Sequence, residues 1–226
     1  MKTGLRNTLL AIPFAILISC SGPGDSAKSN TSVTYSEVGT FFYNEFMQCT
    51  TGSDYNNESE SEMMSAWRSL GLSKDLLGAW GYQPASENNR SQDGFWELQW
   101  TSKDSADAAW QNWLESPEAQ TWAKKYEKVL QCDAENRSPW TFVFPYDPTA
   151  FGQFDTSGDF ASGFTPCNFK DGKTNKDLKV SLAFYGTWLD TLKKEKRNIG
   201  TYSYGLYVPA FESSPVDFWL GNFYES

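Results

Sequence analysis

Two glutamates and a tyrosine are the residues of this sequence best suited to acid–base chemistry. Tyr43 and Glu45 fall in one aromatic stretch and Glu97 in another, and we expect the two stretches to be neighbouring strands. Two carboxylates on one partly enclosed face can separate their pKa values and act as acid and base. The simpler alternative is that both carboxylates face solvent or pair with lysine at the sheet surface.

Strand alternation adds candidate ligand-binding residues to the same face, namely Met47, Phe95 and Gln99. We expect this mixed face to line a barrel and the opposite, apolar face to pack against helices. The predicted helix-packing residues are Phe42, Phe46, Trp96, Leu98, Trp100, Phe160, Phe164, Trp219 and Phe223. Most of the ten tryptophans are spaced along the predicted helices and strands so that they face the core. We therefore favour core packing over a surface that stacks on sugars.

Four cysteines have distinct predicted roles, beginning with Cys20 at the end of an apolar leader. An exported protein can form disulfides. Cys49 ends the first predicted strand and Cys132 ends the second helix, at the same edge of the expected sheet, so we predict a bridge between them. Cys167 then lacks a partner in the chain, and the alternative bridge is Cys49–Cys167.

Composition excludes several kinds of site. The chain has no histidine, which removes the commonest general base and metal ligand and any histidine-ligated haem. We therefore predict no metal and no cofactor. The formal net charge of −9 and the pI near 4.6 argue against nucleic acid as a partner.

The N-terminus predicts export. Lys2 and Arg6 precede an apolar run from Leu9 to Ile18, which is typical of a signal peptide over residues 1–19 and too short to span a bilayer. The sequence Leu-Ile-Ser-Cys resembles a bacterial lipobox, which would make Cys20 the lipidated first residue and anchor the protein in the outer membrane. An ordinary signal peptide with a chance cysteine is the alternative. Residues 20–36 are expected to be a flexible tether.

Residue patterns then predict two α+β units. Residues 37–148 give the order β-α-β-β-α-β of a ferredoxin-like unit, and residues 149–226 give β-α-β-β. Ser102 is expected to cap the second helix and Pro117 to open a further turn. The second unit lacks a last helix and strand, which predicts a reading frame cut short; a naturally shorter unit is the alternative.

Two tandem ferredoxin-like units resemble the dimeric α/β-barrel superfamily, in which two such sheets close into a barrel. The resemblance covers residues 37–226 and rests on element order and aromatic placement. Members include haem-dependent and cofactor-free oxygenases, dehydratases and stress proteins. The histidine of the haem-binding members is absent here, and the resemblance carries over no catalytic residue.

The sequence favours a non-enzymatic, outer-membrane-anchored lipoprotein whose barrel binds a small apolar or aromatic molecule or an envelope partner. The alternative is a cofactor-independent enzyme that uses Glu45, Glu97 and Tyr43. A purely structural role in the envelope is the third hypothesis.

Overall fold

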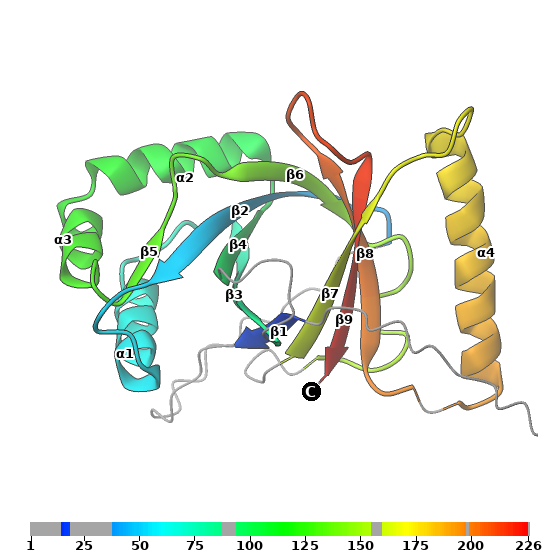
Figure 1. Cartoon of the computed structure of the whole chain (residues 1–226), viewed down its shortest axis with the longest axis horizontal. Coiled ribbons are helices and arrows are strands. Elements are labelled where there is room, and N and C mark those ends of the chain that lie inside the picture. The colour runs from blue at the N-terminus through cyan, green and yellow to red at the C-terminus, as the bar shows by residue number, and fades with distance from the viewer. Residues whose placement is uncertain (1–14, 19–37, 87–93, 155–159, 198, 226) are drawn as a thin grey trace, which may run out of the picture.

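A computed structural model describes residues 15–18, 38–86, 94–154, 160–197 and 199–225. Within these ranges the chain forms nine strands and four α-helices. Figure 1 shows the strands in the middle of the molecule, with helices on either side of them.

The first half of the chain has the predicted order of elements with one additional short strand, β5. Its elements are β2 (Phe41–Thr51), α1 (Asn57–Arg68), β3 (Leu76–Pro84), β4 (Gly94–Trp100), α2 (Lys103–Glu115), α3 (Pro117–Lys125), β5 (Leu130–Cys132) and β6 (Ser138–Val143). The second half contains β7 (Phe160–Cys167), α4 (Asn175–Lys194), β8 (Tyr202–Pro209) and β9 (Phe218–Glu225).

Side-chain caps start the helices where the sequence indicates. The Ser102 hydroxyl accepts a hydrogen bond from the Ser105 amide and opens α2, as predicted. Ser116 caps α3 in the same way, with Pro117 at the first helical position, where its missing amide hydrogen costs nothing. Asn56 and Thr174 form capping boxes at the starts of α1 and α4.

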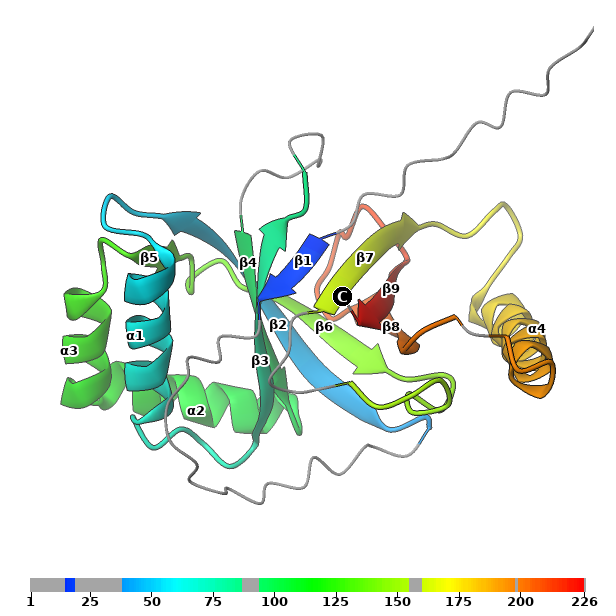
Figure 2. The same ribbon diagram turned by 90° about the horizontal axis from the view of Figure 1, so that it is seen from below.

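The strands close into a ring. The hydrogen-bonded order is β4-β3-β1-β7-β9-β8-β6-β2, and β2 also pairs with β4, so eight strands form an antiparallel barrel with β5 attached to β2. Closure leaves no free sheet edge in the ring. Seen from below, the strands fan out around a common centre (Figure 2).

One member of the ring was not expected to belong to the fold. Strand β1 (Ala15–Ile18) comes from the predicted signal peptide, yet it pairs antiparallel with β3 on one side and β7 on the other. Without removal of the leader, these four apolar residues therefore take part in the sheet. The physical reason is that two strand edges face each other at this place, and an apolar extended segment satisfies both.

Three apolar clusters, one inside the barrel and two outside it, hold the fold together. Inside the barrel, aromatic rings from both halves pack on one another, among them Phe46, Tyr82, Phe142, Tyr207 and Phe223. Outside the barrel, α1, α2 and α3 pack on the outer face of β2, β3 and β4 through a second cluster. Helix α4 covers the outer face of β8 with Leu189 and Leu192 on Tyr202 and Tyr204.

Candidate functional site

The two glutamates predicted to share a face lie on opposite faces of the sheet. In the pairing of β2 with β4, Glu45 is opposite Leu98 and Phe46 is opposite Glu97. Glu45 therefore points to the helices and Glu97 points into the barrel. The predicted pair of interacting carboxylates is wrong.

The prediction failed because it assigned the side chains of β2 to the wrong faces of the sheet. Along β2 the buried residues run without a break from Asn44 to Met47, so neither face shows a polar alternation that would tell inside from outside. A shift of one residue reverses every side chain of a strand. Phe42 and Phe46 consequently face the interior rather than the helices, whereas Trp96, Leu98 and Trp100 of β4 face the helices as predicted.

The second half shows the same reversal. The residues predicted to pack against helices pack inside the barrel instead: Phe160, Phe164, Trp219 and Phe223. Phe164 lies between the rings of Phe46 and Tyr82, at centroid distances of 5.7 and 5.3 Å. These aromatic contacts join the two halves of the chain across the barrel.

Glu97 is a buried acid held by three donors in the barrel interior. It is 1% exposed, and its carboxylate accepts hydrogen bonds from Asn44 Nδ2 at 2.5 Å and from the hydroxyls of Tyr82 and Tyr207. Burial raises the pKa of Glu97 to about 7, although the three hydrogen bonds act in the opposite direction. Burial also raises the pKa of both tyrosines well above the usual range.

Glu45 organises a different network on the helix side. One carboxylate oxygen accepts hydrogen bonds from the indole nitrogens of Trp100 and Trp110, at 3.0 and 2.7 Å. The other oxygen accepts from Arg137 Nε at 3.0 Å, and the guanidinium lies 4.2 Å from the centre of the Trp110 ring. Glu45 is 2% exposed, so its charge is buried and balanced by this arginine.

The remaining predicted residues divide between the two faces. Tyr43 packs with the helix-side cluster, where burial and then the nearby Glu45 charge raise its pKa. Met47 is buried in the same cluster. Phe95 packs against the interior cluster, and the Gln99 side chain donates to Asn44 at 3.4 Å. The six candidates thus do not form one site.

A cavity of about 570 Å³ lies between the helices α1–α3 and the sheet of the first half. Six of the ten tryptophans line it: Trp67, Trp96, Trp100, Trp110, Trp113 and Trp122. The other apolar walls come from Met47, Met63, Leu70, Leu72 and Leu76, and Asn112 and Gln131 contribute polar groups. We call this space the tryptophan cavity.

The indole nitrogens of the cavity differ in how they are satisfied. Those of Trp100 and Trp110 donate to Glu45, and that of Trp122 donates to the Met63 carbonyl at 3.0 Å. Trp96 is 7% exposed, and its indole nitrogen has no hydrogen-bond partner among the residues that the structure describes. An unpaired buried donor costs free energy.

Sequence reasoning identified the tryptophans as core residues and missed the cavity. They are largely buried, and Trp67 and Trp96 pack edge to face at 5.0 Å. Their side chains come from α1, α2, α3 and β4, so the space that they leave between them depends on how four elements pack. Periodicity within one element carries no signal for such a space.

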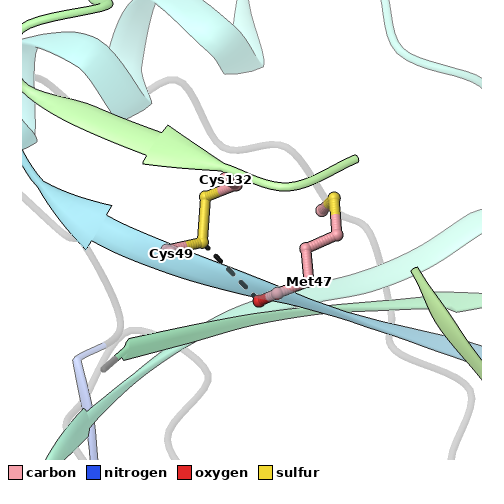
Figure 3. The surroundings of a disulfide bond; sticks show 3 residues. All are labelled: Met47, Cys49 and Cys132. Atoms are coloured by element: carbon pink, nitrogen blue, oxygen red, sulfur yellow. Dashed lines mark hydrogen bonds between the residues drawn. A yellow bond between two sulfur atoms is a disulfide. The ribbon is translucent and has the colours of Figure 1, made fainter. Parts of the chain in front are cut away.

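The predicted disulfide between Cys49 and Cys132 is present. The two residues are directly opposite in the β2–β5 pairing, with Cα atoms 4.0 Å apart (Figure 3). Cys167 is not bridged and its thiol lies 3.5 Å from the Thr165 carbonyl oxygen. Cys20, the predicted lipidation site, lies outside the described residues.

The described ranges of the chain contain neither a metal-binding cluster nor a membrane-spanning helix. Within these ranges no three acidic, histidine or cysteine side chains gather where they could hold a metal ion. None of the helices placed there is both long and apolar enough to cross a membrane.

Comparison with known proteins gives a likeness of fold. No protein-family model matches the chain, and no curated protein sequence matches it significantly. Among solved structures, TA0507, provisionally described as a chlorite dismutase, has 9% identity and a TM-score of 0.46 over 83% of this chain and 80% of its own. A point mutant of the chlorite dismutase of Candidatus Nitrospira defluvii has 11% identity and a TM-score of 0.46. The same enzyme in complex with imidazole has 13% identity and a TM-score of 0.45. Each of these two alignments covers 84% of this chain and 79% of the other.

The geometry corrects the predicted function. The sequence placed the ligand of a non-enzymatic envelope lipoprotein inside the barrel. Aromatic rings of both halves fill that interior. The alternative enzyme built on Glu45 and Glu97 is also wrong, because the sheet separates them. The fold itself is α+β and rich in antiparallel sheet, with four helices among the described residues.

Proposed function

We propose that the protein binds a flat, largely apolar small molecule in the tryptophan cavity. The observation that carries the proposal is the cavity itself, which has a volume of about 570 Å³ and is lined by six tryptophans. Aromatic walls stack on rings, and a few polar groups set orientation, as in most small-molecule sites.

The size of the cavity supports a ligand of one to three fused rings. A volume of about 570 Å³ lies within the range of drug-sized sites. A flat apolar ligand in this space would bury aromatic surface of both partners and add packing contacts.

The network around Glu45 supports a rigid binding wall. Trp100 and Trp110 line the cavity, and both are held by hydrogen bonds to one carboxylate oxygen of Glu45. Fixed side chains lose little conformational entropy on binding, which favours affinity. The role of Glu45 in this proposal is to position two walls of the site.

Isothermal titration calorimetry with 2-naphthol tests the proposal, because this probe carries two fused rings and a hydroxyl. We expect saturable one-to-one binding that Trp96→Phe weakens about fivefold, since the smaller ring offers the probe less aromatic surface. Trp140→Phe is the matched control: Trp140 is 3% exposed and also has an unpaired indole nitrogen among the described residues, but it packs inside the barrel.

A second variant separates binding from folding. Ala109→Phe places a ring into the cavity from α2 and should abolish 2-naphthol binding while the circular dichroism spectrum stays unchanged. Absent or unsaturable binding to the wild-type protein contradicts the proposal. So does an equal effect of Trp96→Phe and Trp140→Phe.

We also propose that the two halves are tandem ferredoxin-like units that form a pseudo-dimeric barrel. In support, β6 joins the halves by pairing with β2 of its own half and β8 of the other. Within the described residues the second half has no counterpart of α2, α3 and β6. In line with this, α4 exposes Val180, Phe184 and Trp188 on one face, whereas α1 in the first half contacts α3.

Anchoring through a lipid at Cys20, in the outer membrane, is proposed as the location of the protein. It is supported by the apolar leader and by the sequence Leu-Ile-Ser-Cys. The ligand proposal does not depend on it, because the cavity is built entirely from the first half of the folded domain.

A further inference from the structure

The seam between β3 and β7 differs from the rest of the barrel in how it is closed. Elsewhere in the ring, strands of the folded domain pair with one another. At this seam the pairing passes through β1, whose four residues, Ala-Ile-Leu-Ile, belong to the apolar leader. Figure 2 shows β1 lying alongside β7.

The pairing of β1 is regular on both sides. On the β3 side, Ile16 is opposite Gln83 and Ile18 is opposite Gly81. On the β7 side, Ile16 is opposite Ala161 and Leu17 is opposite Phe160. Both pairings are antiparallel, so the seam has the width and the hydrogen-bonding pattern of one missing strand.

The position of β1 mirrors that of β6. Strand β6 pairs with the first strand of its own half, β2, and with the second strand of the other half, β8. Strand β1 pairs with β7, the first strand of the second half, and with β3, the second strand of the first half. The leader thus fills the place that a fourth strand of the second half would take.

We propose that the seam between β3 and β7 is an acceptor site for an extended apolar strand of a partner polypeptide. Removal of residues 1–19, which the leader sequence predicts, takes β1 away and exposes two strand edges to solvent. Unpaired edges bind extended segments by β-augmentation, in which main-chain hydrogen bonds supply affinity. The bound leader strand defines the chemistry of the partner segment: at least four residues, apolar and antiparallel to both edges.

A peptide with the sequence of residues 14–19, Phe-Ala-Ile-Leu-Ile-Ser, with a fluorescent label and a lysine tail, is the probe. Protein with Cys20→Ser is folded at full length and then cut at a protease site inserted in the tether, so the leader is removed after folding. We expect the peptide to bind with saturation and to slow amide hydrogen exchange at residues 81–83 and 160–162. The same peptide methylated on the amides of residues 16 and 17 should bind at least tenfold more weakly.

Disulfide trapping checks the register. In a Cys167→Ser background, Gln83→Cys should form a disulfide with a peptide carrying cysteine at position 16, because those residues are directly opposite. The existing Cys49–Cys132 bridge joins residues opposed in the same way. A peptide with cysteine at position 17 is the control and should not react, since its neighbour on β3 is Tyr82.

Three outcomes overturn the proposal. The first is that residues 81–83 and 160–162 stay protected from exchange after the leader is cut and washed away, which means that the seam closes without a strand. The second is unsaturable binding, or equal binding of the methylated peptide. The third is trapping from position 17 as readily as from position 16. A cut leader that remains bound to the protein supports the proposal.

Discussion

The carboxylate of Glu45 accepts a hydrogen bond of 2.7 Å from the indole nitrogen of Trp110, and the two residues are separated by 65 positions in the chain. This contact ties helix α2 to strand β2 at the edge of the tryptophan cavity. Arg137 completes it by pairing with the other carboxylate oxygen while its guanidinium stacks over the same indole ring. A buried charge is thereby used to hold an aromatic wall in place.

Replacing Glu45 should therefore be costly. Glu45→Leu leaves the Arg137 charge and two indole donors without their acceptor, and we expect the free energy of unfolding to fall by about 3–5 kcal/mol. Urea denaturation followed by circular dichroism measures the change. Glu62→Gln is the control, because the Glu62–Lys125 pair is exposed, with side chains 60% and 59% accessible. Losing this exposed pair should change the free energy of unfolding far less, because solvent screens the two charges. Equal effects of the two changes would contradict the structural role of Glu45.

Glu97 predicts a specific dependence of stability on pH. Its pKa is raised from 4.5 to about 7, so the folded protein holds this proton more tightly than the unfolded chain does. The contribution of Glu97 to the free energy of unfolding is then fully present below about pH 4.5 and is lost as the pH rises through about 7. The loss amounts to on the order of 3 kcal/mol.

The measurement is the difference in unfolding free energy between the wild-type protein and Glu97→Gln at pH 4.5, 5.5, 6.5 and 7.5. Taking the difference removes the contribution of the other titrating groups. We expect the wild-type protein to lose stability relative to the variant as the pH rises. A difference that does not change with pH, or that changes in the opposite direction, would show that Glu97 is ionised in the folded state throughout.

The disulfide predicts a large loss of stability on removal. Cys49 and Cys132 are 83 residues apart, and opening a loop of that length costs about 4–5 kcal/mol in the chain-entropy model. The Cys49→Ser/Cys132→Ser double variant should show this decrease in urea denaturation. Cys167→Ser should leave stability nearly unchanged, because that thiol is not bridged. A comparable decrease in both proteins would mean that the bridge contributes little.

Lipidation predicts a simple labelling experiment. Expressed in a Gram-negative host with radioactive palmitate, the wild-type protein should carry label and sediment with the outer membrane. Cys20→Ala should remove the label and leave the leader attached, because processing at a lipobox requires the modified cysteine. Release of an unlabelled, processed wild-type protein into the periplasm would instead indicate an ordinary signal peptide.

Local patterns in the sequence were sufficient for the elements of the folded domain. The Ser102 cap, Pro117 at the start of α3 and the strand around Glu97 can each be identified from neighbouring residues alone. The Cys49–Cys132 bridge follows from the order of those elements, because the ends of β2 and of the helical segment meet at one edge. These features depend on short stretches of chain, where capping, proline geometry and alternation act directly.

The tertiary structure decided which face each strand presents and what lies between the elements. Strand β2 is buried on both sides because it is packed between the helices and the barrel interior, so its alternation could not separate Glu45 from Glu97. The tryptophan cavity arises from the packing of four elements. The position of β1 depends on the edges of β3 and β7, which are far apart in sequence. Such features depend on distances between elements, which no local pattern of residues encodes.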